Sequence, residues 1–233
     1  MPENVGRIVI FDLDGTLLDG HGAGHHAMDQ AFVRVYGQPG NFDRREFAGK
    51  TDPMVLRDAA RDMGLPLDAL TWSRLTEAFL EELQQATTTH PVTAMPGSVE
   101  LLETLTRDPR VGLAVGTGNL DRGAAIKLRA AGLDRFFPVG GFGNDADDRP
   151  GMLAAAIRRA RTFYASPQAR VVAVGDTPRD ASSAAVNQVP LIGVATGHYD
   201  GEALRQAGAQ AVFHSLETKA AVIAAIDRLT PLT

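Results

Sequence analysis

Short apolar runs recur along the chain and are separated by stretches of helical length. The runs lie at residues 8–11, 111–115, 171–174 and 191–195, with a weaker one at 211–213. Runs of this length that are rich in β-branched residues and bounded by turn signals are typical of buried strands. Because they alternate with helix-length segments, the pattern predicts a parallel sheet covered by helices on both faces.

The segments between the runs have the composition of helices. Capping signals support two of them, since Asn119 can cap one helix and Thr177 stands before Pro178, a proline suited to the first helical position. We expect helices at about residues 97–107, 119–131, 151–164, 178–187 and 215–228.

One long segment interrupts the alternation directly after the first predicted strand. Residues 18–95 show no convincing strand pattern, and their apolar residues recur at helical spacing, as in Leu75, Phe79 and Leu83. We therefore expect an α/β fold, a Rossmann-like parallel-sheet core with an inserted helical cap domain. The core comprises residues 1–16 and 96–233, and the cap comprises residues 17–95.

The residues that directly follow the apolar runs carry the candidate chemistry. In open parallel sheets, sites form at the carboxyl ends of the strands. Asp12 and Asp14 follow the first run, and Thr117 follows the second between two glycines. Asp176 follows the third run, in the sequence GDTPRD. Separate strands are thus expected to bring carboxylates and a hydroxyl to one edge of the sheet.

This set of groups suits a metal ion and a phosphoryl group. Carboxylates that lie this close raise one another's pKa unless a cation keeps them ionised. Oxygen ligands without Cys or His in these turns favour Mg²⁺. Gly116 and Gly118 allow a close approach of the backbone, and the N-terminus of the next helix attracts an anion. A carboxylate can attack phosphorus, and a second carboxyl can protonate the leaving alcohol.

These motifs resemble those of the haloacid dehalogenase superfamily, in particular its phosphatase branch. The resemblance rests on DLDGT at residues 12–16, on Thr117 in AVGTGN and on GDTPRD at residues 175–180. The helical insert after the first motif resembles the C1-type cap of that family. The resemblance spans nearly the whole chain and includes phosphoglycolate phosphatase-like and β-phosphoglucomutase-like members.

The resemblance implies a role for each matching residue. Asp12 would be the nucleophile and a magnesium ligand, and Asp14 would be the general acid/base, with its backbone carbonyl also at the metal. Thr117 would bind the phosphoryl oxygens. Asp176 would ligate Mg²⁺, and Asp180 would do so directly or through water. The dehalogenating branch lacks the second acid of the first motif, so the presence of Asp14 favours phosphate chemistry.

The basic residue of the family is replaced in this chain. Members usually carry a lysine, commonly before a proline, ahead of the helix that precedes the last strand. Arg149 precedes Pro150 at that place, and we assign it the catalytic role. An arginine supplies the charge and can bind phosphate bidentately, although its shape differs from that of lysine. Lys127 is the less favoured substitute, because the pattern places it in the middle of the preceding helix.

The cap is expected to determine substrate specificity by closing over the strand ends and excluding water. The sequence GKTD at residues 49–52 resembles a cap loop that faces the active site in relatives. His21 and Arg57 are further cap candidates, and the alternative for all of these cap residues is a solvated surface. The expected substrate is a small phosphorylated metabolite, phosphoglycolate-like or a sugar phosphate. The predicted substrate-binding residues are Gly118, Asn119, Lys50, Thr51 and His25.

Composition narrows the possible classes of protein. The 233 residues are 44% hydrophobic and 22% charged, enough to bury a large core. A net charge of −5 without a basic run argues against nucleic acid as a partner. The absence of cysteine excludes disulfides, thiolate ligands and a cysteine nucleophile. The N-terminus shows no signal-peptide pattern, and no long apolar run is present, so we expect a cytoplasmic protein without membrane contact.

Two alternatives to a Mg²⁺-dependent phosphatase stay open on the sequence. A phosphosugar mutase would use the same motifs but must shield its phosphoenzyme from water. A non-enzymatic nucleotide- or phosphate-binding module would use the turn at residues 116–119 and would need neither Mg²⁺ nor Asp12. The pattern carries no information on oligomeric state.

Overall fold

The computed structural model describes residues 4–44 and 49–232 and has the α/β architecture that the sequence predicts. The described residues form a six-stranded parallel sheet in the order β5-β4-β1-β6-β7-β8. Its strands are β1 (Arg7–Phe11), β4 (Val111–Gly116), β5 (Gly140–Gly141), β6 (Arg170–Gly175), β7 (Leu191–Val194) and β8 (Ala211–Phe213).

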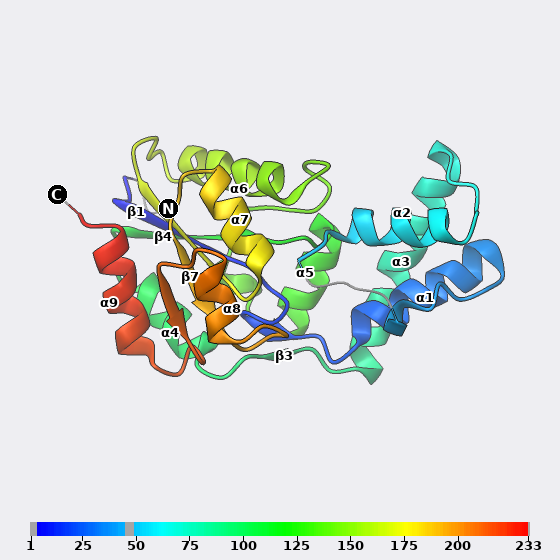
Figure 1. Ribbon diagram of the computed structural model, residues 1–233, viewed down its shortest axis with the longest axis horizontal. Helices are drawn as coiled ribbons and strands as arrows, with labels where there is room; N and C mark the ends of the chain where they lie inside the picture. The colour runs from blue at the N-terminus through cyan, green and yellow to red at the C-terminus, as the bar shows by residue number, and fades with distance from the viewer. Residues whose placement is uncertain (1–3, 45–48, 233) are drawn as a thin grey trace.

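Helices cover both faces of this sheet (Figure 1). The side chains of β1 alternate between two apolar clusters: Ile8 and Ile10 pack with residues of α6 and α7, whereas Val9 and Phe11 pack with residues of α4 and α9. Both faces of the central strand β1 are thus buried, as expected for a parallel sheet. The core helices are α4 (Ser98–Thr106), α5 (Asp121–Ala130), α6 (Arg149–Phe163), α7 (Pro178–Val186), α8 (Gly201–Gln206) and α9 (Lys219–Leu229), with a 3₁₀ helix at Asp134–Phe136.

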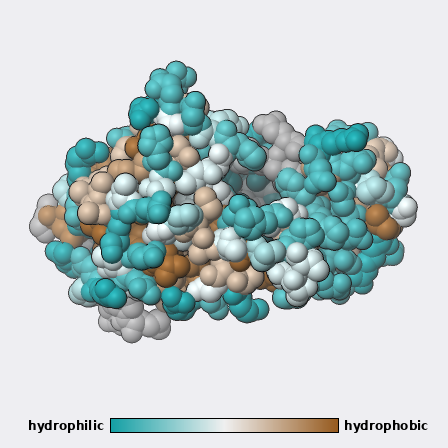
Figure 2. Space-filling view, turned by 90° about the horizontal axis from the view of Figure 1, so that it is seen from below, coloured by the Kyte–Doolittle hydropathy of each residue, from teal (hydrophilic) through white to brown (hydrophobic). Residues whose placement is uncertain are grey.

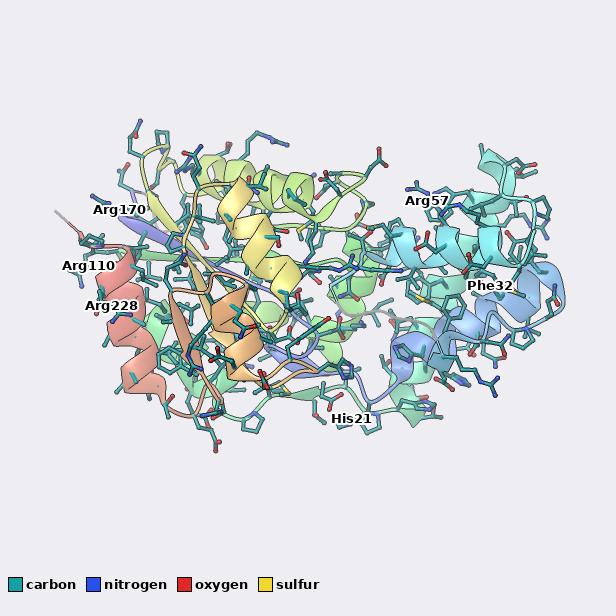
Figure 3. The ribbon with its side chains drawn as sticks, viewed as in Figure 1. His21, Phe32, Arg57, Arg110, Arg170 and Arg228 are labelled. Atoms are coloured by element: carbon teal, nitrogen blue, oxygen red, sulfur yellow. The ribbon has the colours of Figure 1, made fainter. Side chains whose placement is uncertain are left out.

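The inserted segment forms a helical cap beside the sheet, to the right in Figure 1. It contains α1 (Ala23–Tyr36), a 3₁₀ helix at Phe42–Arg44, α2 (Asp52–Asp62) and α3 (Ala69–Thr89). α1 packs along α3. Phe32 of α1, marked in Figure 3, is buried with its ring 5.0 Å from that of Phe42. Hydrophilic residues cover most of the cap surface seen in Figure 2.

The cap and the core are joined by a short antiparallel ribbon that the sequence pattern missed. Within the described residues, β2 (Leu18–Asp19) pairs with β3 (Thr93–Ala94). The expectation of no strand in this segment was therefore wrong. The pattern missed both strands because two residues are too few to show a period-2 alternation. His21 lies at this junction (Figure 3), with Nε2 3.0 Å from Thr93 Oγ1. The boundaries predicted for the cap domain, at residues 17 and 95, stay a prediction.

Most predicted core elements lie within two residues of their expected bounds, apart from the start of α9, but some short ones were missed. β5 consists of two glycines and offers no side-chain pattern. A Cβ on Gly141 would lie 2.5 Å from the carbonyl oxygen of Met152, so glycine lets α6 pack directly on this strand. The helix α8 has only six residues. Within residues 4–44 and 49–232, no helix combines the length and the apolar character needed to cross a membrane.

Candidate active site

The register of the central strands brings the predicted motifs to one level of the sheet. Phe11, the last residue of β1, pairs with Val115 of β4 and with Val174 of β6. The next residue, Asp12, donates its backbone N–H to the carbonyl of Val174 at 2.9 Å. Asp12 is therefore fixed between the loops that follow β4 and β6, where Thr117 and Asp176 begin their turns.

Asp12, Asp176 and Asp180 form a buried carboxylate cluster in the described part of the chain. One oxygen from each of these side chains lies within 4.8 Å of the others. Burial raises the pKa of Asp12 to about 6, against the opposing effect of Arg149. Burial, together with the charges of Asp180 and Asp12, raises the pKa of Asp176 to about 8. The cluster thus carries more negative charge than its surroundings balance.

The surroundings of Asp176 fit a metal ligand. Thr16 Oγ1 donates a hydrogen bond of 3.1 Å to Asp176 Oδ1. Cβ atoms at Gly15 and Gly197 would lie 2.4 Å and 1.9 Å from Asp176 Oδ2, so these glycines leave room for the carboxylate. A set of closely spaced carboxylate oxygens matches a hard divalent cation such as Mg²⁺. The predicted Mg²⁺ ligands Asp12, Asp176 and Asp180 are therefore brought together.

Arg149, to which we assigned the catalytic role, is buried beside this cluster and is not a solvated surface charge. It is the first residue of α6, which Asp148 caps through the N–H of Gly151. Its buried guanidinium donates to Asp12 Oδ2 at 2.5 Å and also to Asp180 Oδ1. Although burial opposes its charge, Asp12 and Asp180 raise the pKa of Arg149 further. The arginine thus compensates two carboxylates of the cluster.

Asp180 has a structural role in addition to its place in the cluster. Thr177 caps α7 by accepting from the N–H of Asp180, and Asp180 Oδ2 accepts from the N–H of Thr177 at 3.0 Å. This capping box confirms the predicted helix start at Thr177-Pro178. It fixes one oxygen of Asp180 on its own helix, while the other oxygen faces Arg149.

Thr117 is held so that its hydroxyl hydrogen stays available. Its Oγ1 accepts two hydrogen bonds from Asn119, one from the backbone N–H at 3.2 Å and one from the side-chain amide at 2.8 Å. The hydroxyl can therefore donate to another oxygen, the role expected of a phosphoryl-binding group. The sequence suggested that Asn119 caps α5. It does not, because its amide binds Thr117 and Asp14. The N–H of Leu120 is bound instead by Asp52 of the cap.

Asp14 lies outside the carboxylate cluster and binds Lys127, the residue that the sequence made the less favoured substitute for the lysine of the family. Lys127 Nζ is 2.9 Å and 2.8 Å from the two oxygens of Asp14. Lys127 does lie in the middle of α5, but it was wrong to take this as a reason against its presence at the site. Helix side chains extend toward the helix N-terminus, so a long lysine two turns into α5 reaches the sheet edge.

The charges of this second group keep Asp14 ionised. Desolvation opposes the charge on Asp14, yet Lys127 and the amide of Asn119 lower its pKa below the ordinary value. Desolvation likewise opposes the charge on Lys127, but Asp14 and Asp52 raise the pKa of its ammonium. The Asp14 side chain is 43% exposed and that of Lys127 is 7% exposed, so the lysine holds Asp14 from the buried side.

The cap loop lies directly on the turn after β4. The N–H of Asp52 donates to the carbonyl of Gly118 at 2.8 Å. A Cβ on Gly118 would lie 2.5 Å from the carbonyl oxygen of Lys50, so glycine is required for this contact. Thr51 is buried and caps α2 by accepting from the N–H of Met54, and Lys50 Nζ lies 3.2 Å from Asp58. The backbone of this loop thus reaches the site, whereas these side chains serve the cap.

The other cap candidates are not all at the site. His25 lies 3.6 Å from Asp43; burial lowers its pKa, and it also feels the charges of Lys127 and Asp14. Arg57 instead stacks over the ring of Trp72 at 4.7 Å and lies 3.6 Å from Asp147 of the core (Figure 3 labels Arg57). His21 contacts the junction ribbon. The roles of Gly118, Asn119, Lys50, Thr51 and His25 toward a substrate stay predictions.

Proteins of known structure share this fold. A family model described as a haloacid dehalogenase-like hydrolase matches residues 7–187. No curated protein matches the chain. A hydrolase from Pseudomonas syringae is similar in structure, with a TM-score of 0.72 and 25% identity over 95% of this chain and 99% of that chain.

Two further solved structures are similar at lower identity and bear on the fold. A predicted phosphoglycolate phosphatase from Haemophilus somnus has a TM-score of 0.69 and 18% identity, over 94% of this chain and 98% of that chain. CbbY from Rhodobacter sphaeroides, in complex with xylulose-(1,5)bisphosphate, has a TM-score of 0.72 and 19% identity, over 91% of this chain and 95% of that chain.

Proposed function

Because the chain belongs to the haloacid dehalogenase-like hydrolase family, we propose that it is a Mg²⁺-dependent phosphatase that acts through an aspartyl-phosphate at Asp12. The substrate is a small phosphorylated metabolite, phosphoglycolate-like or a sugar phosphate. The observation that carries the proposal is the buried cluster of Asp12, Asp176 and Asp180 with an arginine beside it. A buried group of acids is costly unless cations compensate its negative charge.

The residues of the site divide the reaction between them. Asp14, which is ionised in the free protein, takes up a proton when the anionic substrate binds beside it. An oxygen of Asp12 then attacks phosphorus, and the bond from phosphorus to the leaving oxygen breaks as Asp14 gives that oxygen this proton. Asp14, then a carboxylate, takes a proton from water as the water oxygen attacks phosphorus. The bond between phosphorus and Asp12 breaks, and inorganic phosphate is released. Mg²⁺, when bound, neutralises charge on the phosphoryl oxygens and keeps its carboxylate ligands ionised.

The positions of the other groups support this division of roles. Thr117 has a hydroxyl hydrogen available for a phosphoryl oxygen, and Arg149 supplies a positive charge next to Asp12. The cap loop lies on Gly118 and covers the strand ends, which favours a small substrate and the exclusion of bulk water. Two proteins of similar structure agree with this substrate class: a predicted phosphoglycolate phosphatase, and CbbY in complex with a sugar bisphosphate.

The proposal is tested with an aryl phosphate and Mg²⁺. Asp12→Asn removes the nucleophile and is expected to reduce kcat at least about 10³-fold, within the range for loss of a catalytic nucleophile. Chelation of divalent ions is expected to have the same effect on the unsubstituted protein. Asp134→Asn, a change at an exposed acid of the core, serves as the matched control and should keep full activity. Hydrolysis by the Asp12→Asn protein near the unsubstituted rate would reject the proposal.

A panel of phosphorylated metabolites, ranked by kcat/KM, then separates this function from its alternatives. Hydrolysis of phosphoglycolate or of sugar phosphates supports the phosphatase. Negligible hydrolysis with isomerisation of a hexose 1-phosphate would indicate a mutase. Tight ligand binding that depends on neither Mg²⁺ nor Asp12 would indicate a binding module.

A further inference from the structure

Lys127 is a buried, charged residue whose role the motifs do not explain. Its side chain is 7% exposed, and its ammonium contacts both oxygens of Asp14. Burying an ammonium costs free energy unless a partner compensates its charge, and Asp14 is that partner for Lys127. In the mechanism proposed above, Asp14 must place one carboxyl oxygen beside the leaving group and then beside water.

Residues of both the core and the cap surround Lys127. The helix α5, which carries it, lies between the sheet and the cap (Figure 1) and packs against α3. A Cβ at Gly24 of α1 would lie 3.7 Å from Lys127 Nζ. Gly123 lies one turn before Lys127 on the same face of α5. A Cβ at Gly123 would lie 3.7 Å from Oδ2 of Asp52, which belongs to the cap. The charge of Asp52 acts on Lys127.

Asp14 is also tied to the phosphoryl-binding turn. The amide of Asn119 donates to Asp14 Oδ2 at 2.6 Å and to Thr117 Oγ1 at 2.8 Å. Lys127 and Asn119 therefore approach the Asp14 carboxylate from two directions and define its orientation. Without the lysine, a side chain that is 43% exposed has rotamers that turn it toward solvent.

We propose that Lys127 is a positioning residue, which holds the Asp14 carboxyl in the orientation needed for proton transfer to the leaving group. The proposal rests on the function proposed above. Lys127 does not touch the substrate in this scheme; it acts through Asp14. A misplacement of about 1 Å of a catalytic group can cost about 10²-fold in rate, which sets the expected size of the effect.

The experiment compares Lys127→Met, Lys127→Arg and Arg129→Met. Arg129 is an exposed residue of the same helix, so Arg129→Met is the matched control and should leave the activity unchanged. kcat/KM is measured with 4-nitrophenyl phosphate and with the best alkyl phosphate of the panel, because kcat/KM reports on steps up to alcohol release. An alkyl leaving group needs the proton of Asp14, whereas 4-nitrophenolate leaves without it.

We expect Lys127→Met to reduce kcat/KM about 10²-fold for the alkyl phosphate and less than about 10-fold for 4-nitrophenyl phosphate. Lys127→Arg keeps a charged donor and should restore at least tenfold of the loss. The melting temperature and the shift in it caused by Mg²⁺ are measured for each variant, so that a change in folding or metal binding is recognised. An equal loss with both substrates, or no loss, would overturn the proposal.

A double-mutant cycle tests whether Lys127 acts through Asp14. In the Asp14→Asn background, Lys127→Met should change kcat/KM by less than about threefold, since the group it positions is already disabled. If the two losses multiply, Lys127 acts independently and the proposal fails. Activity of Asp12→Asn near the unsubstituted level would instead reject the proposed function, and this outcome is distinct from a failure of the Lys127 variants.

Discussion

Arg149 determines how the site tolerates its buried acids. It contacts Asp12 and Asp180, whereas Asp176 is bound by the neutral hydroxyl of Thr16 and has a pKa raised to about 8 by burial and by the neighbouring carboxylates. The arginine is therefore suited to two carboxylates, and the third needs a further cation. This unequal compensation supports the proposed binding of Mg²⁺ at the cluster.

Arg149→Met is expected to destabilise the metal-free protein by about 3–5 kcal/mol, because it leaves Asp12 and Asp180 buried without their partner. Arg149→Lys keeps the positive charge and should cost less. Denaturant unfolding measures both variants, with and without Mg²⁺, and added Mg²⁺ should recover part of the loss in Arg149→Met. Equal stability of the Met variant and the unsubstituted protein would contradict this account.

Gly197 offers a second test at the residue scale. An alanine there would bring Cβ to within 1.9 Å of Asp176 Oδ2, so the carboxylate must move away from its present place. We expect Gly197→Ala to weaken Mg²⁺ binding about tenfold or more, a loss of about 1.4 kcal/mol. Titration calorimetry measures the affinity. His198→Ala, a change at an exposed residue of the same loop, should bind Mg²⁺ normally.

Among the elements, the strands and the motifs directly after them could be predicted from the sequence. Asp12, Thr117 and Asp176 each follow a run whose length and β-branched content identify a buried strand. Parallel strands share one carboxyl edge, so these residues had to meet whatever the details of packing. The acidic cluster was therefore predictable from local pattern and topology.

Other features depended on contacts between segments far apart in the sequence. Lys127 reaches Asp14 across 113 residues, and Asn119 leaves its helix-capping role to bind Asp14 across 105. Asn119 can cap a helix, but its tertiary partners outweigh this preference. The N–H of Leu120 is bound by Asp52, and the N–H of Asp121, the first residue of α5, is bound by Asn144. Local pattern contains no information on such exchanges.

The docking of α2 on α5 yields a prediction at the scale of elements. Asp52 is half-buried, its carboxylate binds the N–H of Leu120 at 2.9 Å, and desolvation raises its pKa to about 6. Asp52→Ala leaves that N–H unsatisfied and should destabilise the protein by about 1–3 kcal/mol. Hydrogen exchange at the Leu120 amide should become faster.

The matched variant at this position is Asp52→Asn, which keeps an acceptor for the Leu120 N–H. It should preserve slow exchange at that amide and lose less stability than the alanine variant. If both variants exchange as slowly as the unsubstituted protein, the carboxylate does not hold the cap loop on α5.

For the whole molecule, the raised pKa values of Asp12 and Asp176 predict that stability and Mg²⁺ binding depend on pH together. An acid whose pKa is higher in the folded than in the unfolded chain binds more protons when folded. The metal-free protein therefore loses stability as pH rises from about 4, the unfolded value, to about 8. Mg²⁺ must displace these protons, so its affinity rises over the upper part of the same range.

The rise in melting temperature caused by a fixed Mg²⁺ concentration should accordingly be larger at pH 8 than at pH 6. Differential scanning calorimetry at both pH values measures this rise. A ligand at 100 times its Kd adds about 2.7 kcal/mol to the free energy of unfolding, which is large enough to detect. Asp176→Asn has no proton to displace at that position and should show a smaller difference between the two pH values. A Mg²⁺ effect independent of pH would contradict the raised pKa values.

The ribbon of β2 and β3 has a consequence for how such an enzyme can change its substrate over evolutionary time. Neighbouring strands lie only about 4.8 Å apart, so the two ends of the inserted segment leave and rejoin the sheet almost at one point. A different insert could be spliced in there without stretching or rebuilding the chemical machinery beneath. The catalytic core and the cap, which is expected to determine the substrate, can therefore evolve separately.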